Sequence, residues 1–290
     1  MSNVLKIGND VLQAEVWPLG ARLNQLRFAG SDMLDGSLNL DDATGPKRFN
    51  GAVVGPVANR IAAGAAEIDG RAFSFEKNEG GITTLHSGTD GVHACIWTVE
   101  AADETFLSLS LDLKDGHGGF PGNRSLLVNY EIIGAALRVS FEAETDTATW
   151  INLALHPFWT LDGNGREGLD IHINSTEYTP IDERKIPTGE IADVSGTIFD
   201  LRTPAAPSTE IDHNFVLTGT QPAVTLMGPT LRLDIETDAP GVQIFTGRPT
   251  GIAIEPQHFP DTPHHPNFPS ILLTPGDTYR QVSTYRLYRR

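Results

Sequence analysis

Alternation of apolar and polar residues is the feature that most constrains what this chain can fold into. Four segments repeat with a period of two: 107–114, 126–132, 137–144 and 231–237. In the first, leucine occupies every second position from 107 to 113. This period places alternate side chains on one face of a β-strand. Shorter strands are predicted at 11–17, 24–29, 66–75, 242–246, 251–255 and 280–288.

The same pattern predicts the fold class. No segment keeps an apolar period of 3.6 residues over three turns, so we expect few helices, all of them short. The 29 glycines and 19 prolines suit a chain with many turns. We therefore predict an all-β fold, a large antiparallel β-sandwich. The turn-rich segment 185–210 holds apolar residues throughout and is expected to cross the sandwich surface, so residues 1–290 are predicted to form a single domain.

Charge and composition narrow the classes of partner. A formal net charge of −16 disfavours binding to nucleic acid, whose phosphates such a surface repels. No apolar stretch approaches the ~20 residues of a membrane span, so no membrane partner is expected. The first residues show no basic segment followed by an apolar run, and Cys95 is the single cysteine. We expect a cytoplasmic protein.

A candidate histidine follows from the alternation in the segment WINLALHPFW. If residues 150–156 form a strand, Ile151, Leu153 and Leu155 point into the core. His156 then points the other way, and Pro157 ends the strand. A histidine beside a proline at a strand end also fits a purely structural role, which is the commoner case for such a pattern.

A candidate carboxylate comes from the segment GIAIEPQHF. Ile252 and Ile254 are predicted to be core residues, which leaves Glu255 on the opposite face. By the same reasoning Gln243 faces away from the core in GVQIFTG. The concave face of a curved sheet can gather such side chains, and a histidine with a carboxylate there can perform general acid–base chemistry. A solvated face remains the alternative for Glu255.

The segment HFPDTPHHP is the one candidate for metal binding. It places His258, His264 and His265 near Asp261. Zinc needs three or four ligands in tetrahedral reach, and this segment has three prolines. We interpret it as a surface loop and expect no metal site.

Several separated motifs together resemble the aldose 1-epimerase (galactose mutarotase) family, in matching order and spacing over nearly the whole chain. They are FNGAVVGPVANRIAAG at 49–64, NEGGITTLHSG at 78–88, NLALHPFWTLDG at 152–163, IDHNFVL at 211–217, GVQIFTG at 241–247 and the long block IEPQHFPDTPHHPNFPSILLTPGDTYRQVSTYRL at 254–287. Any one motif is a weak signal, whereas all six in order are a strong one.

The resemblance implies a large β-sandwich with a wide sugar cleft and the interconversion of the α and β anomers of a free aldose. It places the catalytic base on Glu255 and the catalytic acid on His156. Further sugar contacts are implied for four positions, namely Arg60, His86, Asp212 and Gln243. No metal or organic cofactor is implied. The expected partner is a free monosaccharide, and the expected assembly is a monomer or a homodimer.

Two departures from the common pattern lie beside these positions. The family often reads LHGG where this chain has Ser87 after His86, and often TYFNL where this chain has Pro157 to Thr160. Both leave the reaction intact, and both put the preferred sugar in doubt.

Three other functions compete with this prediction. A glycoside hydrolase would use two carboxylates, with Asp212 and Glu255 as the candidates. A sugar-phosphate mutarotase would need extra basic residues near the cleft, which the net charge makes less attractive. A non-catalytic sugar-binding protein could stack aromatic rings on the sugar. The candidate rings are Trp97, Trp150, Trp159, Phe245 and Phe259, most of which are expected in the core.

Overall fold

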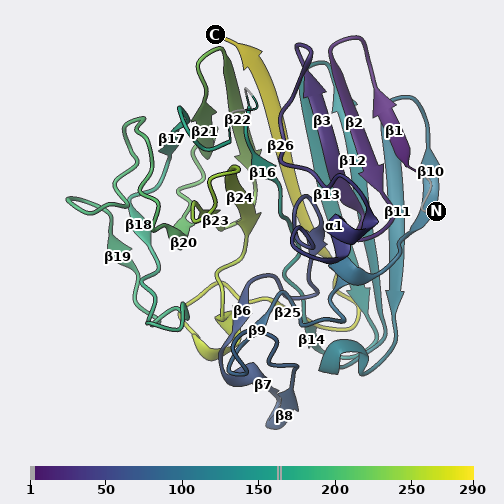
Figure 1. The fold of residues 1–290 in the computed structure, drawn as a ribbon. Helices are drawn as coiled ribbons and strands as arrows, with labels where there is room; N and C mark the ends of the chain where they lie inside the picture. The colour runs from purple at the N-terminus through teal and green to yellow at the C-terminus, as the bar shows by residue number, and fades with distance from the viewer. Residues whose placement is uncertain (1–3, 162, 164) are drawn as a thin grey trace.

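An eight-stranded antiparallel sheet spans the molecule in a computed structural model that describes residues 4–161, 163 and 165–290 (Figure 1). In spatial order its strands are β10 (Thr98–Ala102), β11 (Phe106–Leu113), β12 (Arg124–Ile133), β13 (Ala136–Thr145), β26 (Tyr279–Arg289), β22 (Leu231–Thr237), β21 (Val224–Met227) and β17 (Asp170–Ile173). Strand β26 therefore joins β13 to β22 in the middle of the sheet.

Two smaller sheets pack with it. One has the order β16 (Phe158–Trp159), β24 (Ile252–Gln257), β23 (Gly241–Phe245), β20 (Asp212–Val216), β18 (Glu177–Tyr178) and β19 (Ala192–Asp193). The other consists of β1 (Leu5–Gly8), β2 (Leu12–Trp17), β3 (Arg22–Phe28) and β4 (Ser31–Asp32). In Figure 1, β1–β3 lie beside the half of the large sheet that contains β10–β13.

The remaining elements are short. Four two-stranded ladders pair β14 (Thr149–Trp150) with β25 (Leu272–Leu273), β15 (Ala154–Leu155) with β5 (Val53–Val54), β6 (Arg60–Ile61) with β9 (Thr84–Leu85), and β7 (Ala65–Ile68) with β8 (Arg71–Ser74). The helices of the described residues are α1 (Leu40–Thr44) and the 3₁₀ turns η1 (Ala62–Gly64), η2 (Val92–Ala94), η3 (His117–Gly119) and η4 (Thr262–His264). The predicted all-β class with few short helices is confirmed.

The apolar face of each alternating strand forms the core. In β12, Leu126, Val128 and Tyr130 are buried, and Val128 lies opposite Phe141 of β13. One hydrophobic cluster contains residues of all three large sheets, including Leu23 of β3. Burial of these faces drives the sheets together, because each buried aliphatic side chain contributes about 1.5–3 kcal/mol.

Two strand predictions were wrong. Residues 150–156 form no continuous strand: β14 and β15 pair with different partners, and a parallel bridge to Val57 intervenes at Asn152. Both faces of this segment are buried, so alternation does not separate a core side from a solvent side. Residues 66–75 fold back as a hairpin of β7 and β8, because Asp69 and Gly70 form the turn and both have positive φ.

Segment 185–210 contains little regular structure. Only β19 lies within it, and its pairing with β18 attaches it to the edge of the six-stranded sheet. None of the helices in the described part of the chain is long and apolar enough to span a bilayer.

Candidate active site

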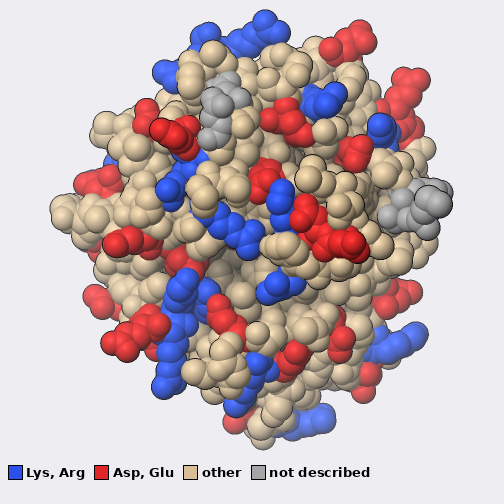
Figure 2. Space-filling model, viewed as in Figure 1, with Lys and Arg blue, Asp and Glu red and all other residues tan. Residues whose placement is uncertain are grey.

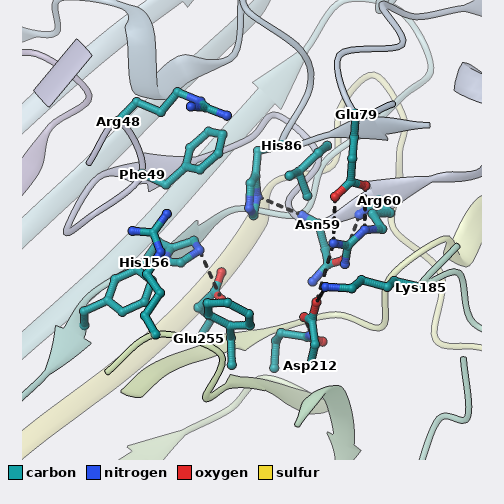
Figure 3. Close-up of a pocket in the computed structure, with 15 residues that line it drawn as sticks. Arg48, Phe49, Asn59, Arg60, Glu79, His86, His156, Lys185, Asp212 and Glu255 are labelled. Carbon is teal, nitrogen blue, oxygen red and sulfur yellow. Dashed lines mark hydrogen bonds and ion pairs between the residues drawn. The ribbon is translucent and has the colours of Figure 1, made fainter. Parts of the chain in front are cut away.

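All six residues named from the sequence line one pocket of about 240 Å³, beside the six-stranded sheet (Figure 3). They are Arg60, His86, His156, Asp212, Gln243 and Glu255. The pocket lies just below the ~300–1,000 Å³ of sites for drug-sized ligands, so it suits a smaller molecule.

Backbone pairing positions two of these side chains at the bottom of the pocket. Glu255 lies in β24 directly opposite Gln243 of β23. The backbone N–H of His156 donates to the carbonyl of Ala52 at 3.0 Å, and its own carbonyl accepts from Gly51 at 2.7 Å. These two backbone hydrogen bonds fix His156 directly after β15, against the turn that precedes β5.

His156 and Glu255 contact each other. Nε2 of His156 lies 3.4 Å from Oε1 of Glu255, and the two side chains are only 8% and 2% exposed. Burial raises the pKa of Glu255 well above 4.5, and the nearby Asp212 carboxylate raises it further. Burial also lowers the pKa of His156 from 6.5 to about 3. Both shifts favour the neutral groups, so the pair holds a single proton over a wide pH range.

Several buried polar atoms here have no hydrogen-bond partner among the described residues. They are Oε2 of Glu255, Nδ1 of His156 and Oε1 of Gln243. A buried polar atom without a partner costs about 1–3 kcal/mol. A ligand that carries several hydroxyl groups can remove part of this cost at Glu255 and Gln243, which both line the pocket.

His86 is fixed as a hydrogen-bond donor to the pocket. Its Nδ1 accepts from the backbone N–H of Asn59 at 3.1 Å. Burial lowers the pKa of His86 well below 6.5, with a further contribution from His156, so the ring is neutral. In a neutral ring whose Nδ1 is an acceptor, the hydrogen is on Nε2. The ring edge across from Nδ1 therefore donates.

The tautomer of His86 bears on whether His86, His156 and Glu255 bind a metal ion or form hydrogen bonds to a ligand. Ligand-capable atoms of His86, His156 and Glu255 lie within 4.8 Å of one another, which is short enough to consider a metal ion. Metal binding uses the lone pair of an unprotonated imidazole nitrogen, and Nε2 of His86 carries hydrogen. The geometry thus favours hydrogen bonding to a ligand over coordination of an ion.

The opposite wall is a network of paired charges. Arg60 donates to Glu79 through Nε at 2.7 Å and Nη2 at 2.8 Å, and Nη2 lies 3.5 Å from Asp212. Asp212 also accepts from Lys185 at 3.0 Å and from Gln243 at 2.9 Å. Burial raises the pKa of Asp212, but Arg60 and Lys185 lower it by more, so this carboxyl stays ionised.

The wall around His156 is aromatic. The rings of Phe49 and Phe158 lie nearly parallel to its imidazole, with centroid distances of 6.1 and 5.2 Å. Arg48 lies over Phe49, with Cζ 4.6 Å from the ring centroid. Arg248 lies over Phe158 at 5.0 Å and donates to Oδ1 of Asn50 at 3.1 Å.

The sequence analysis missed several lining residues. They are Arg48, Phe49, Asn59, Glu79, Leu85, Phe158, Lys185 and Arg248. Phe49, Asn59, Glu79, Leu85 and Phe158 lie inside the quoted motifs but were not assigned a role. Lys185 comes from a segment without periodicity, so no signal in its neighbourhood points to the pocket. For Arg248, a charged residue directly after the strand that carries Gln243 was an available signal.

The two departures from the family pattern differ in their relation to the pocket. Ser87 does not line it: its Oγ accepts from the N–H of Val57 at 2.9 Å and donates to the Val57 carbonyl at 3.0 Å. Phe158 does line the pocket, against His156. Only the second departure therefore places a side chain on the surface of the pocket.

The HFPDTPHHP segment is less exposed than predicted. Asp261 is 2% exposed and accepts from the N–H of Ala62 at 2.8 Å. His264 and His265 lie 2.6 and 3.5 Å from its carboxylate, and Asp261 raises the pKa of His264. This cluster is an ion-paired support for the chain beside Arg60. His258 is not part of it and instead packs near Tyr279.

Of the five aromatic residues considered for sugar stacking, only Phe245 lines the pocket. The other four are at most 4% exposed and pack elsewhere in the interior, namely Trp97, Trp150, Trp159 and Phe259. This agrees with the expectation that most of them are core residues.

Comparisons with known proteins agree with the geometry. The family model described as aldose 1-epimerase matches residues 3–286. Human galactose mutarotase is 30% identical over 97% of this chain and 92% of its own, and an aldose 1-epimerase of Haemophilus influenzae is 30% identical over 85% and 83%.

Solved structures give the same result. An aldose epimerase homologue from C. elegans superposes with a TM-score of 0.93 at 26% identity, over 100% of this chain and 99% of that one. A galactose 1-epimerase from Lactobacillus acidophilus superposes with a TM-score of 0.90 at 26% identity, over 99% and 94%. The family match spans nearly the whole sequence, and the chain belongs to the aldose 1-epimerase family of isomerase enzymes.

Proposed function

We propose that this chain interconverts the α and β anomers of a free aldose, with Glu255 and His156 as the acid–base pair. The observation that carries the proposal is the 3.4 Å contact between Nε2 of His156 and Oε1 of Glu255 at the bottom of the pocket. Anomerisation needs one group that takes a proton from the C1 hydroxyl and one that gives a proton to the ring oxygen. The hydroxyl oxygen and the ring oxygen are both bonded to C1, so they lie close together, which matches the short spacing of the pair.

In the proposed cycle the pair starts with its proton on His156. Ionised Glu255 takes the proton of the C1 hydroxyl while imidazolium His156 protonates the ring oxygen, and the C1–ring oxygen bond breaks. The open-chain aldehyde turns about C1–C2, and ring closure on the other face reverses both transfers. After opening, the proton of the pair is on Glu255 and both groups are neutral. Burial favours this arrangement.

The remaining residues bind and orient the sugar. Asp212 and Gln243 offer acceptors, while Arg60 and His86 offer donors, so several ring hydroxyls can be satisfied at once. A site that pairs a hydroxyl with buried polar groups discriminates strongly against a sugar that lacks it. The bound partner is thus a monosaccharide with a free anomeric centre. A cytoplasmic location, a monomeric or homodimeric state and the absence of a cofactor remain predictions from the sequence.

The proposal is tested by measuring exchange between α and β anomers of neutral aldoses by polarimetry and by NMR. Acceleration of at least one sugar is expected, and Glu255→Gln and His156→Asn should each lower turnover by at least about 100-fold. Matched controls are Glu236→Gln and His172→Asn, which lie in β22 and β17 away from the pocket. A folded Glu255→Gln or His156→Asn protein with near-normal turnover would remove that residue from the pair.

Release of sugar from a nitrophenyl glycoside would instead favour a hydrolase. The two carboxylates that a hydrolase would use are Asp212 and Glu255. Gln243 lies between them, because it donates to Asp212 and lies opposite Glu255 in the sheet. His156 has no task in that chemistry, so anomerisation accounts for more of the pocket.

A further inference from the structure

The charges that line the pocket are unevenly paired. Four cationic side chains and three carboxylic groups line it. Arg60 and Lys185 are within 4 Å of Glu79 or Asp212. For Arg48 and Arg248, by contrast, no ion pair with any described carboxylate is found, although Arg248 is half-buried. The His156 side of the pocket therefore carries two uncompensated positive charges.

The surface agrees with this asymmetry. Figure 2 shows Lys and Arg side chains gathered around a hollow in the middle of the viewed face, on a surface where acidic groups are otherwise abundant. Figure 3 places Arg48 above Phe49, on the same side as His156, while Glu79, Arg60, Lys185 and Asp212 lie on the other side of Glu255.

Neither guanidinium group has a carboxylate partner among the described residues, although Arg248 donates a hydrogen bond to Oδ1 of Asn50. The positive charge of Arg248 lowers the pKa of His156, which works against the imidazolium that the reaction requires. An anion bound between the arginines would offset this charge. Guanidinium groups present forked N–H donors that match the oxygens of carboxylate and phosphate.

The orientation of the sugar ring indicates which of its carbons would carry such an anionic group. This step rests on the proposed function. If His156 protonates the ring oxygen and Glu255 faces the C1 hydroxyl, the other neighbour of the ring oxygen is C5. The substituent on C5 then lies on the His156 side of the pocket, away from Glu255 and towards the wall formed by Phe49 and Phe158.

We propose that the preferred substrates are aldoses whose C5 substituent is anionic, either a carboxylate or a phosphorylated hydroxymethyl group, and that Arg48 and Arg248 bind this anion. The net charge of −16 does not oppose this. Charges farther away than about 8 Å are largely screened at physiological salt, so the arginines that line the pocket determine the potential felt by the ligand.

The test compares kcat/KM for anomeric exchange of glucose, glucuronic acid and glucose 6-phosphate, and of the three galacto counterparts, at low salt. The rate of each sugar in buffer alone is subtracted. We expect at least one anionic sugar to exceed its neutral counterpart by about tenfold or more, as charge-assisted hydrogen bonds are about twice as strong as neutral ones. The preference should shrink as salt is raised. Carboxylate and phosphate sugars distinguish the two anions.

Substitutions of the two arginines test whether they cause the preference for anionic sugars. Arg248→Gln and Arg48→Gln should each lower kcat/KM for the anionic sugar by about 10-fold or more and should not lower that for the neutral sugar. Arg248→Lys, which keeps the charge but not the fork, should fall in between. The charge-matched control is Arg138→Gln, an exposed residue of β13 that is 49% exposed and should leave both values unchanged.

The outcomes separate this inference from the proposed function. If no aldose of either kind is accelerated, the proposed function fails and this inference with it. If neutral aldoses are accelerated and the anionic ones are no better, anomerisation stands and the anion site is wrong. Equal losses for neutral and anionic sugars in the arginine variants would also overturn the anion site.

Discussion

Nδ1 of His86 accepts a hydrogen bond from the backbone N–H of Asn59 at 3.1 Å, and this contact makes Nε2 the hydrogen-bearing nitrogen of a neutral ring. The proposed role of His86 as a donor to the sugar depends on it. His86→Ala should lower kcat/KM by about 10- to 100-fold, because a buried acceptor on the substrate loses its partner. Nitrogen chemical shifts of the imidazole should show the Nε2–H tautomer and no titration near pH 6.5. A ring that titrates near pH 6.5 would contradict this assignment.

The pH profile of kcat/KM should be a broad bell. The pair works with one proton: it gains a second as pH falls through the pKa of His156 at about 3, and loses its last as pH rises through the raised pKa of Glu255. Activity at pH 5 should therefore equal that at its maximum, after the buffer rate is subtracted and folding is checked. An ordinary histidine would instead give a midpoint near pH 6.5, and such a midpoint would count against the shared-proton model.

Asp212→Asn should move the basic limb of that bell to lower pH. The carboxylate of Asp212 raises the pKa of Glu255, so its removal lets Glu255 lose its proton more easily. KM should also rise, since asparagine offers one acceptor oxygen where Asp212 uses two, Oδ1 for Gln243 and Oδ2 for Lys185. Asp277→Asn, at an exposed turn before β26, is the control. A basic limb that stays in place would show that Asp212 does not act on Glu255 through charge.

Ser87→Ala should cost stability and leave KM unchanged. The Ser87 hydroxyl bonds both the N–H and the carbonyl of Val57, and its backbone φ is +64°. Alanine leaves these buried backbone groups without that partner, which costs about 1–3 kcal/mol of unfolding free energy in urea. Ser74→Ala on the exposed hairpin strand β8 should cost less than about 0.5 kcal/mol. A changed KM with unchanged stability would mean that Ser87 reaches the sugar.

His93→Gln should reduce the loss of stability in acid. Burial lowers the pKa of His93 from 6.5 to about 4. The unfolded chain then binds a proton that the folded chain excludes between these values, so stability present above pH 6.5 is lost as pH falls towards 4. At pH 5 this one group accounts for about 2 kcal/mol. The pH dependence of unfolding should be flatter in His93→Gln and unchanged in His172→Gln; parallel curves for all three proteins would refute the assignment.

Alternation predicted the strands that have one buried and one solvated face. β12 and β13 are of this kind, while β11 and β22 each bury one residue of the polar face, Ser108 and Asp234. The predicted limits of all four strands agree with the structure to within two residues. It failed for residues 150–156, where both faces are buried and the pairing partner changes. For 66–75 the turn signal is the Asp69–Gly70 pair, which divides the predicted strand into β7 and β8.

Part of the candidate site could likewise be predicted from the sequence, and part could not. The family motifs named six residues that the fold brings into one pocket, although Arg60 and Glu255 are far apart in the chain. Pattern alone found only that His156 and Glu255 could share a face. The ion pairs of Glu79 with Arg60 and of Lys185 with Asp212 join segments that are distant in the chain, and periodicity does not encode such proximity. The same is true of Arg48 and Arg248, which reach the pocket without an ion pair to a described carboxylate. Total charge was a poor guide to the pocket, because ion pairs and distance decide which charges a ligand meets.

Strand β26 lies between β13 and β22, although it follows all the other strands of the sheet in the chain. On a ribosome that adds about 5–20 residues per second, β13 would wait on the order of ten seconds for Tyr279–Arg289 to be made. Throughout that interval the nascent protein presents the long edge of β13 unpaired, and exposed edges of this kind recruit other chains. The step at which the two halves of the sheet join is therefore also the step that removes this exposed edge.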